Sequence, residues 1–190
     1  MTVPDISRAV SIRSLPLSPQ VKGNSDIAPP ANHKQVEIGL LLGSNIQPEH
    51  FLPLAVSKLR NTLTVLEVSK VWETQAVGTD GPSFLNAAIR AHTSLDPQSL
   101  KREVLRPLET SLGRIRTDDK YAPRTIDIDL VTWNSIPMDD DLWRYAHAAV
   151  PVAELLPLTK SSTHNENLVQ ASDRLLRKTS MHYRPDVILA

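Results

Sequence analysis

Two aspartates, Asp127 and Asp129, stand two residues apart in an apolar run that begins at Arg124. Because alternate residues of a β-strand point to the same face, we expect both carboxylates to project together, about 7 Å apart at the backbone. Such a pair suits Mg²⁺, which usually combines one or two protein carboxylates with the phosphates of a substrate. The alternative is an amphipathic edge strand with solvated acids, and the pair by itself favours that alternative.

Basic residues are concentrated immediately before the aspartates. They are Arg114, Arg116, Lys120 and Arg124, within eleven residues. Cations crowded beside a metal site predict a shared anion, because a metal ion and arginine forks can bind different oxygens of one polyphosphate. A solvated loop, in which these arginines pair with Asp118 and Asp119, explains the same residues. The sequence around the aspartates leaves both interpretations open.

Four other side chains could contact a ligand, each with a common structural alternative. Phe84 and Asn86 have the same strand parity, so a ring and an amide could stack on a flat heterocycle and bind its edge. Core packing is the usual role of such a phenylalanine. Glu109 could accept hydrogen bonds from a ligand, and His147 could reach a phosphate or an adenine edge, although surface positions are commoner for both. Gly43-Ser44-Asn45 is too short for a Walker-type phosphate loop, and that pattern is absent from the sequence.

The order of the elements that must position these residues predicts the fold. The expected elements are a strand over 36–42, a helix over 51–59, β-rich segments over 64–74 and 84–93, a helix over 97–112 and a strand over 125–133. This order is that of the ferredoxin-like split βαβ arrangement, so we expect an α+β fold, an antiparallel sheet with helices packed on one face. The connection 75–83 is longer than a tight hairpin needs, which is typical of a binding loop.

Length and composition predict one main domain that acts on small molecules. Residues 1–35 indicate a disordered leader, 36–158 the domain, and 159–190 a C-terminal tail with a short helix. With 21 basic and 21 acidic side chains the formal charge is zero, so no nucleic-acid or membrane partner is expected. Cysteine is absent, and no apolar run approaches the roughly 18 residues that cross a bilayer. We therefore expect a cytoplasmic protein that is a monomer.

Five segments taken together resemble the 6-hydroxymethyl-7,8-dihydropterin pyrophosphokinases of folate biosynthesis. They are Leu42-Gly43-Ser44-Asn45, Trp72 to Gly78, Phe84-Leu85-Asn86-Ala87, Glu109 with Gly113-Arg114-Ile115-Arg116, and Pro123 to Leu130. The resemblance covers about residues 36 to 158 and implies a ferredoxin-like fold. It also implies a reaction in which a pyrophosphoryl group passes from ATP to the hydroxymethyl oxygen of the dihydropterin and leaves AMP.

The same resemblance implies roles for individual residues. Asp127 and Asp129 are expected to hold two Mg²⁺ ions that bridge the triphosphate, and Arg114 and Arg124 to act as catalytic residues on the moving phosphates. The implied pterin-binding residues are Thr74, Val77, Phe84 and Asn86. The implied ATP-binding residues are Glu109, Arg116, Lys120, Leu130 and His147.

One departure from the family pattern keeps other functions open. The arginine and the aromatic residue that usually follow the histidine in this family are missing between Ala148 and Leu158. Arg144, which precedes the histidine, and Leu155 are the candidate replacements. The first hypothesis is an active pyrophosphokinase, because both aspartates and both arginines are present. The second is a degenerate relative that binds nucleotide or pterin without turnover. The third is a regulatory ferredoxin-like domain for another small molecule, which rests on fold alone.

Overall fold

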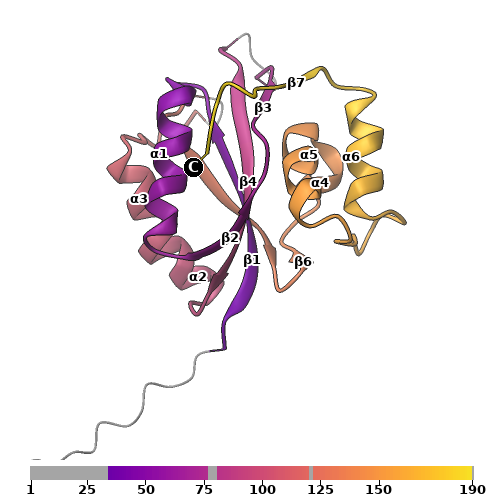
Figure 1. The fold of residues 1–190 in the computed structure, drawn as a ribbon, viewed down its shortest axis with the longest axis horizontal. Coiled ribbons are helices and arrows are strands. Elements are labelled where there is room, and N and C mark those ends of the chain that lie inside the picture. Colours follow the sequence, from indigo (N-terminus) through magenta and orange to yellow (C-terminus); the bar gives the residue numbers. More distant parts are fainter. Residues whose placement is uncertain (1–33, 77–80, 120–121, 190) are drawn as a thin grey trace, which may run out of the picture. The chain divides into compact units, whose positions relative to one another are not determined.

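An antiparallel sheet forms the centre of the computed structural model, which describes residues 34–76, 81–119 and 122–189 (Figure 1). Its strands are β1 (Val36–Ser44), β2 (Thr64–Val68), β3 (Trp72–Thr74), β4 (Phe84–Thr93), β5 (Asp127–Trp133), β6 (Ile136–Pro137) and β7 (Met181–Tyr183). Their order is β6-β5-β1-β4-β3-β7, and β2 also pairs with β4. The order β5-β1-β4-β2/β3 is that of the predicted ferredoxin-like fold, which is therefore confirmed. The predicted leader lies almost entirely outside the described residues.

Helices α1 (Pro48–Arg60), α2 (Pro97–Leu100) and α3 (Arg106–Ser111) cover the first face of the sheet (Figure 1). Apolar residues of β1 and α1 form the core there. The fully buried ones include Ile38, Leu40, Leu42, Leu52, Val56 and Leu59. The intervening side chain Leu41 packs instead against the cluster on the second face. The near-continuous apolar character of β1 follows from this burial on both sides.

The second predicted helix is one helical stretch with a widened turn at its middle. A π-helical segment, η1 (Lys101–Leu105), joins α2 to α3, and the backbone N–H of Arg106 donates to the carbonyl of Lys101. Pro107 follows within the first turn of α3. Proline cannot donate the usual hydrogen bond of a helix, so the wider turn accommodates it without ending the stretch. Asp96 caps the start by accepting from the N–H groups of Gln98 and Ser99.

The second face is also covered by helices, so the expectation of helices on one face was wrong. These are α4 (Asp141–Arg144), α5 (Ala146–Leu155) and α6 (Leu168–Leu176). Figure 1 shows them across the sheet from α1 and α3. Residues of α5 and α6 form a second apolar cluster with Ala88 and Val131 of the sheet. Helix α5 is apolar on nearly all sides, so it has no amphipathic period that the sequence could reveal.

The described residues of the expected C-terminal tail pack on the rest of the domain. The short helix α6 packs on α5, and β7 adds a strand beside β3. Val187, only 9% exposed, belongs to the core of the first face. In the part of the chain that the structure describes, none of the helices has the length and hydropathy of a membrane span.

Candidate active site

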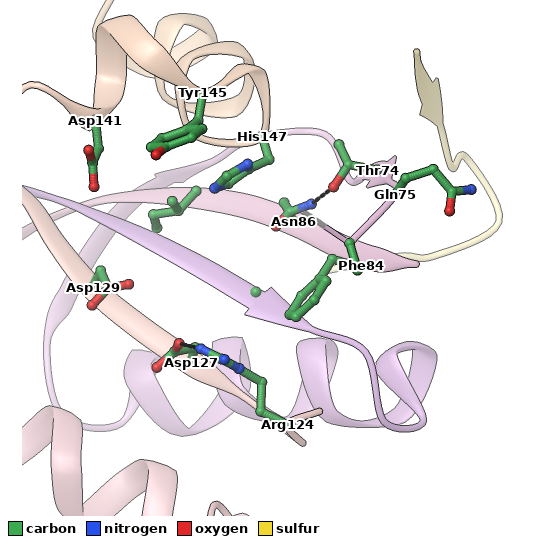
Figure 2. A pocket seen from close by; sticks show the side chains of 13 residues that line it. Thr74, Gln75, Phe84, Asn86, Arg124, Asp127, Asp129, Asp141, Tyr145 and His147 are labelled. Atoms are coloured by element: carbon green, nitrogen blue, oxygen red, sulfur yellow. Dashed lines mark hydrogen bonds and ion pairs between the residues drawn. The ribbon is translucent and has the colours of Figure 1, made fainter. Parts of the chain in front are cut away.

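A cavity of about 400 Å³ lies between the second face of the sheet and the start of α5 (Figure 2). Strands β1, β3, β4 and β5 supply its floor, and the segment from α4 to α5 supplies its opposite wall. Seven of the predicted site residues line it. They are Thr74, Phe84, Asn86, Arg124, Asp127, Asp129 and His147. Phosphate-binding and heterocycle-binding candidates therefore share one cavity.

The aspartates lie on β5 as their spacing predicts. Both line the cavity, while Ile128 between them is 4% exposed in the opposite core. Across the ladder Asp127 pairs with Gly43 and Asp129 with Leu41 of β1. A Cβ atom at Gly43 would lie 3.4 Å from Asn86 Oδ1 and 3.7 Å from the Phe84 ring. Glycine at this position therefore keeps the floor open between the acids and the heterocycle-binding candidates.

Arg124 lies in the loop before β5 and is fixed there by Asn45. The N–H of Arg124 donates to Asn45 Oδ1 at 2.7 Å, and its carbonyl accepts from the N–H groups of Asn45 and Ile46 at 3.1 Å each. Ser44 adds a hydrogen bond from its hydroxyl to the carbonyl of Thr125, at 2.6 Å. These bonds explain what the segment Gly43-Ser44-Asn45 does here. It holds the arginine beside the acids rather than wrapping a phosphate.

Two arginines converge on Asp127. Arg124 Nη1 lies 2.5 Å from Asp127 Oδ2, and Arg114 Nη2 lies 3.4 Å from Asp127 Oδ1. Gly113, with φ of 80°, ends the preceding helix in the left-handed conformation and directs Arg114 toward the sheet. The Arg114 side chain is only 10% exposed, and its Nε has no hydrogen-bond partner among the residues that the structure describes. Burial lowers the pKa of Arg114, and Asp127 opposes that shift. A buried donor of this kind is suited to an anion.

Asp129 lies where its surroundings disfavour its negative charge, and Lys101 offsets this only in part. It opens toward the cavity, yet the surrounding protein limits its hydration and raises its pKa to about 6, and the charges of Asp127 and Glu109 act in the same direction. A cation at this carboxylate would offset both effects. No group of three or more acidic or histidine side chains suited to a metal occurs in the described part of the chain. Two carboxylates fit Mg²⁺ that shares the oxygens of a bound phosphate chain.

The heterocycle-binding candidates lie at the other end of the cavity. Asn86 Nδ2 donates to Thr74 Oγ1 at 3.0 Å and to the carbonyl of Trp72 at 3.3 Å, which fixes the orientation of the amide (Figure 2). The ring of Phe84 lies 5.8 Å from Arg124 Cζ. An oriented amide beside a partly exposed ring can bind the edge and the face of a flat ligand. Val77, predicted to join them, lies outside the described residues.

Tyr145 lines the cavity and was not predicted. Its ring is 39% exposed and stacks on His147, with 5.4 Å between ring centroids and 25° between planes. Burial lowers the pKa of His147 against the opposing charge of Asp141, and the lowered pKa favours the neutral imidazole and thus a hydrogen bond over a charge. The sequence signal was the position of this tyrosine one residue before Ala146-His147. The suggested replacements do not line the cavity: Arg144 is exposed elsewhere, and Leu155 lines a different depression.

Several predicted site residues do not line the cavity, and Arg114, which contacts Asp127 from outside the lining, is one of them. Glu109 is 2% exposed, and its carboxylate accepts from the N–H of Ile128 at 2.9 Å and from Arg116 at 2.5 Å. Arg116 is 55% exposed, and Leu130 packs against the core of the first face. Lys120 lies outside the described residues. Contacts of Glu109, Arg116, Leu130 and Lys120 with ATP stay predictions.

A family model described as 7,8-dihydro-6-hydroxymethylpterin-pyrophosphokinase matches residues 39–157. A 2-amino-4-hydroxy-6-hydroxymethyldihydropteridine pyrophosphokinase of Bacillus subtilis is 40% identical over 99 residues, covering 50% of this chain and 58% of that protein. The enzyme of the same name from Methylorubrum extorquens is 35% identical over 128 residues, covering 61% of this chain and 80% of its own length.

Longer proteins share the matched region. A mitochondrial folate synthesis bifunctional protein of Arabidopsis thaliana is 32% identical, and the match covers 63% of this chain but 23% of that protein. A crystal structure of Plasmodium falciparum HPPK-DHPS superposes with a TM-score of 0.58 at 11% identity, covering 76% of this chain and 43% of that one. The structural likeness supports the fold alone. The chain thus spans only part of several relatives.

Proposed function

The chain belongs to the 7,8-dihydro-6-hydroxymethylpterin-pyrophosphokinase family, and from that membership we propose its reaction. It transfers a pyrophosphoryl group from ATP to the hydroxymethyl oxygen of 6-hydroxymethyl-7,8-dihydropterin, with release of AMP. One observation carries this proposal. A single cavity has two aspartates and Arg124 at one end, where Arg114 also contacts Asp127 from outside the lining, and the Asn86 amide with the Phe84 ring at the other.

The polar end of the cavity suits a triphosphate. When ATP binds, Arg114 and Arg124 release the Asp127 carboxylate and bind phosphate oxygens instead. Asp127 is then free to bind a cation. Arg114 already has one buried donor without a partner, so a phosphate oxygen satisfies a group that the protein leaves unpaired. Mg²⁺ held by Asp127 and Asp129 would neutralise the transferring phosphates, and we assign two ions to this pair.

The other end of the cavity suits the pterin. Asn86, oriented by Thr74, binds the polar edge of the ring system, and Phe84 and Tyr145 offer aromatic surface to its faces. The hydroxymethyl oxygen then attacks the β-phosphorus, and the bond from that phosphorus to the oxygen shared with the α-phosphate breaks. AMP leaves with that oxygen, and the hydroxyl proton is lost to solvent. The protein contributes position and charge rather than covalent chemistry.

The alternative of a relative that binds without turnover is not favoured. It is motivated by the arginine and the aromatic residue that are missing after His147, yet both arginines that converge on Asp127 are present. The cytoplasmic location and the monomeric state remain predictions.

Release of AMP tests the proposal. We expect AMP from ATP and Mg²⁺ only when the hydroxymethyl dihydropterin is added, and loss of that AMP in Asp129→Ala. Asp173→Ala, which changes an exposed acid of α6 outside the cavity, is the matched control and should retain activity. A folded wild-type protein that forms no AMP under these conditions would refute the proposal.

A further inference from the structure

The last described residues of the chain cross the edge of the sheet beside the cavity. We call residues 181–189 the C-terminal strap. Its strand β7 pairs with β3, with Met181 opposite Thr74 and Tyr183 opposite Trp72. Met181 packs against the cluster on the second face, whereas Val187 and Leu189 pack against the first. The family match ends at residue 157, so the strap lies beyond the matched region.

Strand β3, to which the strap pairs, supports the heterocycle end of the cavity. It has three residues, and Thr74 and the two residues after it line the cavity. The carbonyl of Trp72 and the hydroxyl of Thr74 hold the Asn86 amide. Since so short a strand has few ladder hydrogen bonds of its own, its position depends on both of its neighbours. Strand β4 holds one edge of β3, and β7 holds the other.

Arg184 connects this strand to the helix layer. Its N–H donates to the carbonyl of Val71 at 3.0 Å, which extends the β3–β7 pairing by one bond. Its guanidinium lies 3.0 Å from Glu73 of β3 and 3.1 Å from Glu49 of α1. Asp186 completes the group at 2.7 Å. The side chain is 24% exposed, so the bridge is partly shielded from water. Strand β3 is thereby tied to α1 from outside the cavity.

We propose that Arg184 is a positioning residue for the pterin end of the cavity, acting through Glu73 of β3 and Val71 just before that strand, and thus on Thr74 and Asn86. Arg184 does not line the cavity and need not touch substrate. The identity of the ligand as a pterin rests on the proposed function. The claim that Arg184 fixes the position of β3 does not depend on the proposed function.

Steady-state kinetics of Arg184→Ala test the proposal. We expect KM for the pterin to rise about five-fold, or about 1 kcal/mol, while KM for ATP and kcat stay within about two-fold. Arg184→Lys should recover part of the loss because one carboxylate contact can be kept, and Glu73→Gln should reproduce it. The matched control is Arg90→Ala. Arg90 is 28% exposed and bridges Glu37 and Glu67 on other strands, outside the cavity.

Two results would overturn the inference. One is an unchanged pterin KM in Arg184→Ala. The other is an equal rise of both KM values that Arg90→Ala also produces, which would indicate general destabilisation. Amide hydrogen exchange at residues 72–74 separates this inference from the proposed function. If the wild-type protein forms no AMP, faster exchange at these amides in Arg184→Ala than in Arg90→Ala still supports the positioning role, and unchanged exchange refutes it.

Discussion

Arg124 and Asp127 form an ion pair with 2.5 Å between Nη1 and Oδ2, although residues three apart point to opposite faces of a regular strand. The contact is possible because β5 begins only at Asp127, and Arg124 lies in the loop before it. Asn45 holds the backbone of that loop, so the guanidinium can change partners while its Cα stays in place. Phosphates of the proposed substrate ATP could therefore replace Asp127 as the partner of Arg124 while the strand stays in place.

Replacing Arg124 by lysine tests whether the planar guanidinium matters beyond its charge. Lysine keeps a positive charge but cannot bind two oxygens as a fork, so we expect kcat/KM to fall about 100-fold, or about 2.7 kcal/mol. Thermal stability should change little, because backbone bonds with Asn45 hold the loop. Arg102→Lys, at an exposed arginine of η1, is the control for a conservative change. Activity within two-fold of wild type would argue against phosphate binding by Arg124.

Asp129→Asn is expected to stabilise the metal-free protein at pH 7. The folded state raises the pKa of Asp129 from 3.8 to about 6, so the folded protein resists ionisation of this group. Well below pH 3.8 the acid is protonated in both states and has no effect. Between about pH 4 and 6 it ionises in the unfolded protein but not in the folded one, so stability is lost, and above pH 6 that loss is complete. Urea unfolding should therefore show Asp129→Asn more stable than wild type at pH 7 and equal to it well below pH 3.8. The opposite order at pH 7 would contradict the raised pKa.

With Mg²⁺ and nucleotide bound, the wild-type protein should become more stable than Asp129→Asn. A cation that binds the Asp129 carboxylate stabilises the folded state of wild type but gains less from an amide. Unfolding in the presence of Mg²⁺ and a non-hydrolysable ATP analogue at pH 7 is the measurement. A ligand-induced stabilisation as large in Asp129→Asn as in wild type would exclude Asp129 from the metal site.

Glu109 is expected to stabilise the folded protein, whether or not it also contacts ATP. Its buried carboxylate is the acceptor for the N–H of Ile128, so Glu109→Ala leaves that donor unpaired between the two aspartates. We expect a loss of about 1–3 kcal/mol in the free energy of unfolding. Glu103→Ala, on the same helical stretch but about half exposed, should change it by less than about 0.5 kcal/mol. Equal effects of the two changes would show that the contact with Ile128 carries no special weight.

Tyr145 gives the cavity wall an aromatic face. Tyr145→Ala removes the ring that stacks on His147, and we expect substrate KM to rise about ten-fold, or about 1.4 kcal/mol. Tyr145→Phe keeps the ring and should stay within about two-fold of wild type. Measuring KM separately for ATP and pterin identifies the substrate that the ring contacts. If Tyr145→Phe is as impaired as Tyr145→Ala, the hydroxyl rather than the ring is responsible.

The fold could be predicted from the sequence where side-chain periods were strong. The run of β1 and the alternation around Asp127 and Asp129 placed the central strands and pointed both acids to one face. Helix α5 could not be predicted in this way, because its apolar residues follow no single face and Pro151 interrupts the pattern. Strand β7 has three residues, too few for a period, and its partner β3 lies more than a hundred residues earlier in the chain.

From residue patterns alone, the site could be predicted only where strand parity fixes the direction of a side chain. Parity alone brought Phe84 and Asn86 to one side of β4, and the cavity contains both. Tyr145 was not predicted because it lies in the loop before α5, where no periodicity assigns a direction to a side chain. The buried position of Glu109 depends on the N–H of Ile128, a tertiary contact that a local pattern does not contain.

The most direct test of the central claim is the stoichiometry of the products. ³¹P NMR and mass spectrometry of a reaction with ATP, Mg²⁺ and 6-hydroxymethyl-7,8-dihydropterin should show AMP and the pterin diphosphate in equal amounts, without ADP. Both products should disappear in Asp127→Ala, while the exposed control Asp173→Ala forms them normally. Formation of ADP with a pterin monophosphate, or consumption of ATP that does not depend on the pterin, would contradict transfer of a pyrophosphoryl group.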